Sequence, residues 1–283
     1  MSLVYADLRE YAYAIADGVL THAGPTRMAS QTLVPAQLTR SAGVMPRLYD
    51  IAGATPLTRE AALVLALAQE AEGDAVWFCG LLDVDENVTQ AALAQALTAR
   101  LVLPLPGIGQ CFFRYFDPRV LVQLQWLFTP AQMAWLMGPV RRWKYSIAGA
   151  WEEMRRPEVF APESPGITAY QAFALQRMNV INTLLERLQP PSVAACRGTG
   201  RDILRQLEKA RDHGLQRLQD QEEYAWHGMT VHPDFDRHPL MQARLAHLPA
   251  DADFPYRVAT AELLPADFDR IRDDLNASSR TSA

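Results

Sequence analysis

Three histidines and two aspartates lie close together near the C-terminal end of the chain: His227, His232, His238, Asp234 and Asp236. Imidazole nitrogens and carboxylate oxygens are common zinc ligands, so this segment could serve a metal-dependent hydrolase. Their spacing, however, matches no helical pair, and Pro233 and Pro239 indicate an irregular loop. Loop polarity and helix capping are the simpler interpretation, and we expect no metal, no other cofactor and no catalytic residues.

A second charged group lies within the segment F-F-R-Y-F-D-P-R-V, as Arg114, Asp117 and Arg119. A carboxylate flanked by two arginines could form an anion site. The alternative is structural: aspartate is a favoured N-cap, and proline is favoured at the first helical position. We therefore expect Asp117 to cap a helix that begins at Pro118, with the arginines paired to it or to exposed carbonyls.

The three cysteines, Cys79, Cys111 and Cys196, are widely spaced and form no C-x-x-C pair. Cys79 and Cys111 lie in apolar runs, where a free cysteine behaves as a small buried hydrophobic side chain. The sequence also lacks a G-x-S-x-G elbow, a Walker loop, an H-E-x-x-H motif and a dinucleotide fingerprint. We expect the cysteines to be structural and the protein not to be an enzyme.

Composition narrows the possible partners. The net charge is −5, with acidic and basic residues mixed along the chain, so a nucleic-acid interface is not expected. No run approaches the roughly 20 apolar residues that span a bilayer. The first 17 residues show no basic region followed by an apolar stretch and a cleavage site. We expect a soluble protein of the cytoplasm that does not bind membranes.

The elements that must position these residues change character along the chain. Short apolar runs at 11–16, 46–52 and 75–82 predict strands, and helical spacing predicts helices over 57–72, with Thr58 as N-cap, and 88–97. Two further runs, 100–105 and 110–116, flank a Pro-Gly-Ile-Gly turn and predict a β-hairpin. Two short helices should begin at Pro118 and Pro130, the second ending at Gly138-Pro139, before a last edge strand over 141–148.

A proline-rich linker is expected over 152–166, and the periodicity beyond it is helical. One helix is predicted over 170–188, a second over 200–224, a third from His238-Pro239 and a fourth over 267–275. The fold class is therefore an α/β N-terminal lobe, a mixed sheet with flanking helices, followed by an all-α C-terminal lobe. We place the first lobe at residues 1–150, the second at 165–276 and a disordered tail at 277–283.

The segment F-R-Y-F-D-P-R-V-L, a helix pair and G-P-V-R-R-W together resemble the signature region of the type VI secretion effector-adaptor chaperones. The Tyr13–Gly18 segment resembles the opening strand of that family, which ends in Asp-Gly, and Phe235–Pro239 is similar to a recurring Phe-Asp-x-x-Pro pattern. The family positions are filled here by Arg114, Asp117, Pro118, Arg119, Gly138, Pro139 and Trp143. The Ala- and Thr-rich region 24–43 departs from the compact segment expected there.

The resemblance implies a cytoplasmic adaptor that binds one cognate effector, through the effector's N-terminal region, and helps to load it on the VgrG spike protein. Such a protein needs an interface of apolar anchors and arginines rather than catalytic groups. Candidates for the polar rim of the cargo-binding surface are Arg141, Arg142, Arg201, Arg205 and Arg211. An immunity protein, which would bind a toxin to neutralise it, remains an alternative, and a metal-dependent hydrolase is another.

Overall fold

The computed structural model describes residue 4 and residues 6–19, 28–71, 78–147, 149–248 and 253–281, with the side chains of 67–71 and 279–281 excepted. The chain divides into two compact units. The first comprises residues 1–173 and 191–193, and the second comprises residues 174–190 and 194–283. An α/β unit followed by a helical unit confirms the predicted fold class.

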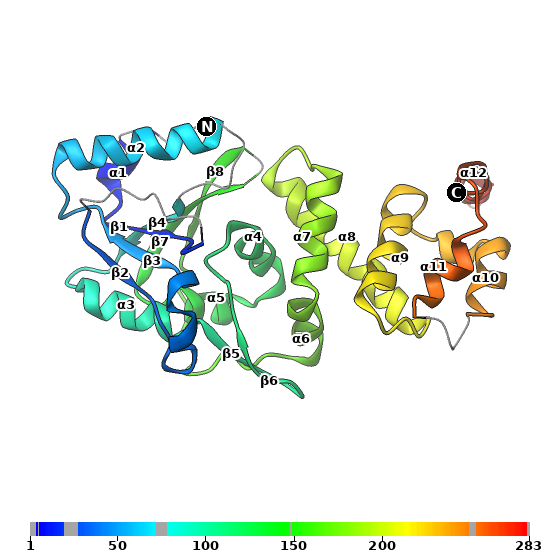
Figure 1. Cartoon of the computed structure of the whole chain (residues 1–283), viewed down its shortest axis with the longest axis horizontal. Helices are drawn as coiled ribbons and strands as arrows, with labels where there is room; N and C mark the ends of the chain where they lie inside the picture. The colour runs from blue at the N-terminus through cyan, green and yellow to red at the C-terminus, as the bar shows by residue number, and fades with distance from the viewer. Residues whose placement is uncertain are drawn as a thin grey trace. The chain divides into compact units, whose positions relative to one another are not determined.

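A six-stranded sheet in the order β2-β3-β1-β4-β7-β8 organises the first unit (Figure 1). Its strands are β1 (Tyr13–Ala16), β2 (Ser30–Thr32), β3 (Arg47–Asp50), β4 (Phe78–Val84), β7 (Val140–Ile147) and β8 (Ala150–Arg155). Neighbouring strands are antiparallel in every pair. The predicted hairpin is present as a separate two-stranded sheet, β5 (Val102–Leu105) and β6 (Gly109–Phe112), with positive φ angles at Gly107 and Gly109 in its turn.

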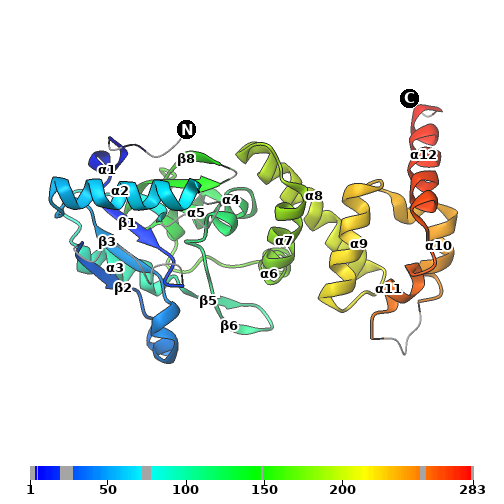
Figure 2. The ribbon, with the colours of Figure 1, turned by 45° about the horizontal axis from the view of Figure 1, so that its top comes forward.

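Helices surround the large sheet: α1 (Asp7–Glu10), the 3-10 helix η2 (Ala36–Val44), α2 (Pro56–Ala71), α3 (Gln90–Ala99), α4 (Pro118–Leu127) and α5 (Pro130–Met137). Helix α2 crosses one face of the sheet in both views (Figures 1 and 2), with Ala62 and Ala66 packed in one core cluster with Ala14 and Phe78. Strand pairing places Ile15, Leu82 and Trp143 on the opposite face.

Two local predictions in this unit need correction. The side chain that caps α2 is that of Thr55, which accepts a hydrogen bond from the backbone N–H of Thr58. Strand β7 is interior rather than at the edge, because the start of the expected linker folds into β8 and pairs with it. Trp151 and Met154 are buried on opposite faces of β8, and the charged residues beside them are more exposed, which suits a strand at the edge of the sheet. Pro157, Pro162 and Pro165 all lie beyond Arg155, so the linker is shorter than expected and begins after that residue.

In the second unit, helices are the only regular secondary structure among the described residues. They are α7 (Met178–Leu188), α8 (Val193–Asp212), α9 (Leu218–Thr230), η3 (Phe235–Arg237), α10 (Pro239–Leu245), α11 (Pro255–Thr260) and α12 (Pro265–Thr281). Helix α6 (Ala169–Gln176) contains the boundary between the units. The core of the second unit is a cluster of buried apolar and aromatic side chains that includes Tyr224, Phe235, Met241, Tyr256 and Ile271.

Helix boundaries in this half differ from the expected ones. Residues 170–188 form two helices, α6 and α7, that meet at Arg177, and residues 200–224 belong to α8 and α9, which are separated at the positive-φ Gly214. Helix α10 begins as predicted, with Pro239 at its first position and the His238 ring as its N-cap. Helix α12 continues to Thr281, into the stretch from 277 that was expected to be a disordered tail.

Candidate functional site

The first group of family positions forms an ion-pair cluster at the start of α4. Asp117 is the N-cap, and its Oδ1 accepts a hydrogen bond from the backbone N–H of Arg119 at 3.0 Å. The Arg119 guanidinium returns to the same carboxylate, with Nη2 2.9 Å from Oδ2. The predicted cap is therefore confirmed, and Pro118 occupies the first helical position, where its missing N–H costs nothing.

Arg114 links this cluster to a segment that is distant in sequence. Its Nη2 donates to Asp17 Oδ2 at 2.5 Å and lies 3.6 Å from Asp117 Oδ2. Asp17 directly follows β1, and its other oxygen accepts from the backbone N–H of Val19 at 3.0 Å. Both aspartates are buried, so the guanidinium group between them compensates two carboxylates that would otherwise be costly to bury.

Cys79, on β4, is completely buried close to the same carboxylates. Burial, together with the charges of Asp17 and Asp117, raises the pKa of the Cys79 thiol. A thiol that stays protonated is a poor nucleophile. The side chain acts here as a small apolar group, and the cluster as a whole holds β1, β4 and the start of α4 together.

The remaining residues of the resemblance follow α5: Gly138 and Pro139 come directly after the helix, and Trp143 lies on β7. Gly138 ends the helix with φ 53°, and a Cβ there would lie 2.6 Å from Nη2 of Arg100. The Arg100 guanidinium donates to carbonyls at the C-terminal ends of two helices, Trp135 O on α5 at 2.6 Å and Ala96 O on α3. Burial lowers the pKa of Arg100. The sequence pattern gave no signal for this double helix cap.

Trp143 is fully buried on β7, against the ring of Tyr115 at a centroid distance of 6.0 Å. Gly80, on the adjacent β4, leaves the space that the indole occupies, since a Cβ there would lie 2.1 Å from Trp143 Nε1. Trp143 is therefore a core residue of the first unit. The residues that carry the resemblance thus build the framework of the first unit.

Arg141 and Arg142 lie on the surface at the start of β7, although not on an edge strand. Both donate to Asp83, Arg141 Nη2 to Oδ1 at 2.9 Å and Arg142 Nε to Oδ2 at 2.8 Å. Burial alone would raise the pKa of Asp83, but the hydrogen bonds from Arg142 and Arg141 hold it below its ordinary value. Arg142 also lies 3.4 Å from Glu153, which accepts the Tyr11 hydroxyl at 2.6 Å.

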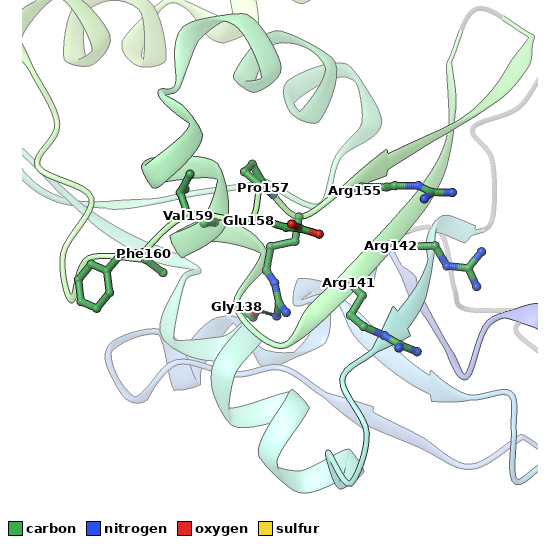
Figure 3. A pocket seen from close by; sticks show the side chains of 11 residues that line it. Gly138, Arg141, Arg142, Arg155, Pro157, Glu158, Val159 and Phe160 are labelled. Carbon is green, nitrogen blue, oxygen red and sulfur yellow. Dashed lines mark hydrogen bonds between the residues drawn. The ribbon is translucent and has the colours of Figure 1, made fainter.

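These two arginines line a pocket of about 570 Å³ with nine other residues (Figure 3). The lining also includes Arg155 and Arg156 from the end of β8, and Glu158, Val159 and Phe160 from the segment that follows it. Phe160 is 87% exposed. Arg155, Arg156 and Phe160 were not among the sequence candidates; the paired dipeptides Arg141-Arg142 and Arg155-Arg156 were the available signal.

The remaining candidate arginines lie on α8 in the second unit. Arg201, Arg205 and Arg211 are all exposed, and Arg205 and Arg211 pair with carboxylates on the same helix, Asp202 at 2.8 Å and Asp212 at 3.0 Å. At about 100° per residue, Arg201 and Arg205 share one face of α8 and Arg211 lies on another. Two of the five candidate arginines belong to the first unit and three to the second, so neither unit contains all five.

The three histidines of the possible metal site face different partners. His227 Nδ1 lies 2.6 Å from the Tyr256 hydroxyl, inside the aromatic core. His232 Nδ1 accepts the backbone N–H of Asp234, and His238 caps α10 while its Nε2 lies 3.2 Å from Asp274. Within the described ranges, no three His, Cys, Asp or Glu side chains are grouped as a metal site would require.

Helices long and apolar enough to cross a membrane are absent from the part of the chain that the structure describes. The chain matches no protein-family model, and neither a curated protein nor a solved structure matches it.

Proposed function

We propose that this protein is a non-enzymatic adaptor that binds an effector of the type VI secretion system and helps to load it on the VgrG spike. The resemblance in the sequence motivates this proposal, and one contact supports it. The segment similar to the family's opening strand ends at Asp17, and the Asp-Pro-Arg segment carries Arg114. Their side chains meet at 2.5 Å, although 97 positions separate them.

This contact matters because the two segments were matched separately. A chance resemblance of either one would not require them to share a partly buried ion pair. Their meeting is what a common framework predicts, in which the same strand and the same helix start are held together. The charged groups of this framework bind one another, which favours a structural role for the motif and leaves the exposed surface for partners.

Co-purification from the source bacterium tests the proposal directly. The full chain, tagged and expressed at its natural level, should capture one effector, identified by mass spectrometry. The purified pair should form a complex, and addition of purified VgrG should give a ternary assembly on size-exclusion chromatography. Deleting the gene should abolish delivery of that effector and leave a second effector of the same secretion system unaffected.

The same experiment separates the adaptor from an immunity protein. An immunity protein inhibits the activity of the toxin it binds, and its loss kills the producing cell without changing secretion. Inhibition of the captured effector, with unchanged delivery after gene deletion, would contradict the proposal. Failure to capture an effector under these conditions would contradict it as well.

A further inference from the structure

Two pairs of arginines face each other across the end of the β7–β8 ladder. Arg142 and Arg155 are direct cross-strand partners. The backbone N–H of Arg156 donates to the carbonyl of Arg141 at 2.9 Å, which continues the same register by one residue and places this pair on the other face of the ladder. Like charges placed directly opposite each other on adjacent strands are destabilising. Nothing in the hydrophobic pattern of either strand requires four arginines here.

Carboxylates beneath the arginines compensate only part of this charge. Asp83 is shared by Arg141 and Arg142, and Glu153 is shared by Arg142 and Arg155. Three guanidinium groups therefore share two carboxylates on this part of the ladder. The carboxylates are also less accessible than the groups they bind: the Arg155 side chain is 77% exposed and that of Glu153 is 27% exposed. An approaching partner meets guanidinium groups first.

Arg156 differs from the other three because its charge is already matched. Its guanidinium forms a bidentate pair with Asp85, at 2.6 and 2.8 Å, and also donates to the Gly138 carbonyl at 2.5 Å. It therefore fixes the segment that follows β8 against the end of α5. The adjacent side chains of Val159 and Phe160 are exposed, and Figure 3 shows them on that segment beside the pocket.

We infer that this pocket binds a short acidic segment of a partner protein, with an apolar side chain of the same segment packed on Phe160. Arg141 and Arg155 lie on opposite faces of the ladder, so the segment would lie across its end, where its carboxylates would accept hydrogen bonds from both. The planar guanidinium groups suit bidentate contacts. The partner's carboxylates would also relieve the repulsion across the ladder. A volume of about 570 Å³ accommodates a few side chains rather than a whole domain.

An acidic protein segment suits the site better than a nucleic acid. The net charge of the chain is −5, which disfavours a polyanion that extends beyond a small basic patch. Phe160 and Val159 offer an apolar surface next to the arginines, which suits a peptide side chain. This inference rests on the proposed function for the source of the segment, an effector or spike protein, but its chemistry can be tested without either.

A peptide library supplies the probe. Random 12-residue peptides displayed on phage should be selected against the full-length protein, and parallel selections against Arg155→Glu and against Phe160→Ser should be sequenced. Selection on the wild-type chain should enrich peptides that combine at least two Asp or Glu residues with an aromatic or large aliphatic residue. The same peptides should not be enriched on either variant.

Affinities should then be measured by fluorescence anisotropy with the most enriched peptide. Arg155→Glu should weaken binding about tenfold or more, because a charge-assisted contact is lost and a like charge replaces it. Arg270→Glu is the matched control, since this arginine is 71% exposed and also has one carboxylate neighbour. Glu158→Gln, which removes the acidic residue of the lining, should strengthen binding about twofold to threefold.

Three outcomes would overturn the inference. They are selection that enriches no peptide, enrichment without acidic residues, and equal weakening by Arg155→Glu and Arg270→Glu. Displacement of the peptide by a single-stranded oligonucleotide at equal concentration would also overturn it in favour of nucleic acid. Effector capture that survives Arg155→Glu, together with failed peptide selection, would remove this site and leave the adaptor function intact. Peptide binding without effector capture would support this site and contradict the adaptor function.

Discussion

In the first unit, polar side chains connect segments that are far apart in sequence, and the core of the second unit is centred on a group of aromatic rings. Arg114 binds Asp17, Arg100 caps two helices, and Gln132 and Gln171 bind each other. In the helical unit, Tyr224 lies against Phe235 and Tyr256, with ring centroids 4.8 and 5.5 Å apart. Polar contacts are directional and fix the path of loops, while aromatic packing mainly removes apolar area from water.

The two glutamines show how specific the polar contacts are. Gln132 and Gln171 each belong to a Thr-x-x-Gln sequence at a helix start, and each accepts the backbone N–H of its threonine through Oε1. Their amide groups exchange hydrogen bonds at 3.0 and 2.8 Å, and Nε2 of each also reaches a backbone carbonyl, Pro165 or Leu127. The two buried glutamine side chains thus satisfy one another and also cap both helix starts.

The largest expected effect tests the aromatic unit. Phe235→Ala should destabilise the helical unit by about 4 kcal/mol, since a fully buried ring is lost and a cavity remains. Urea unfolding, followed by limited proteolysis with mass spectrometry, should place the new cleavage sites within residues 194–283. Phe160→Ala is the matched control, and because this ring is exposed it should change stability by less than about 0.5 kcal/mol. Cleavage that begins in the sheet unit would contradict the division between the two units.

The next effect tests the polar contacts. Gln132→Ala should cost about 2 kcal/mol, because its loss removes the two hydrogen bonds that the buried amide of Gln171 exchanges with it. The double variant with Gln171→Ala should cost clearly less than the sum of the two single variants, as expected for groups in direct contact. Chemical unfolding of the four proteins completes the cycle. Additive losses would mean that each glutamine acts only as a cap for its own helix.

A smaller effect is expected at the start of α4. Asp117→Ala should destabilise the fold by about 1 kcal/mol, the usual loss for a helix N-cap. Asp117→Asn is the matched control, since asparagine caps equally well and removes only the charge that faces Arg114 and Arg119. The difference between these variants in thermal unfolding separates capping from ion pairing. Equal losses would assign the whole effect to the ion pairs.

These contacts also show what the sequence could and could not predict. The cap at Asp117, the hairpin and the start of α10 follow from local rules that involve neighbouring residues, and all three are confirmed. The framework contacts depend on residues dozens of positions apart. No local periodicity connects Arg100 with Trp135, or Gln132 with Gln171. The same reason explains why the sequence predicts a linker from residue 152, although residues 152–155 belong to β8: the pairing of β8 with β7 overrides the prolines that follow it.

Local sequence rules identify the candidate residues that hold the first unit together, but they do not identify the residues that line its surface pocket. Arg114 and Trp143 lie in recognisable segments, whereas Arg155 and Phe160 acquire a shared pocket only when β8 pairs with β7 and the following segment turns back. A pocket of this kind depends on register, and register is set by the tertiary structure. The repeated Arg-Arg dipeptides indicate it only after the pairing is known.

The smallest expected effect concerns a titratable group within the aromatic unit. The His227 ring contacts Phe268 and Tyr256, at centroid distances of 4.5 and 5.7 Å. Burial lowers the pKa of His227, and nearby Glu223 opposes this only in part. The folded state therefore prefers neutral imidazole, and the unfolded state binds the proton more readily. This contribution to stability is complete above the ordinary pKa of about 6.5 and decreases as the pH falls below it.

His227→Gln removes this titration. Urea unfolding at pH 7.5, 6.5 and 5.5 should show that the wild-type chain loses about 1 kcal/mol or less between pH 6.5 and pH 5.5 relative to the variant. The comparison is a difference between two proteins, so the titrations of all other groups cancel. Parallel stability curves for wild type and His227→Gln would mean that the aromatic core accepts the protonated ring, and that its packing is looser around His227 than around Phe235.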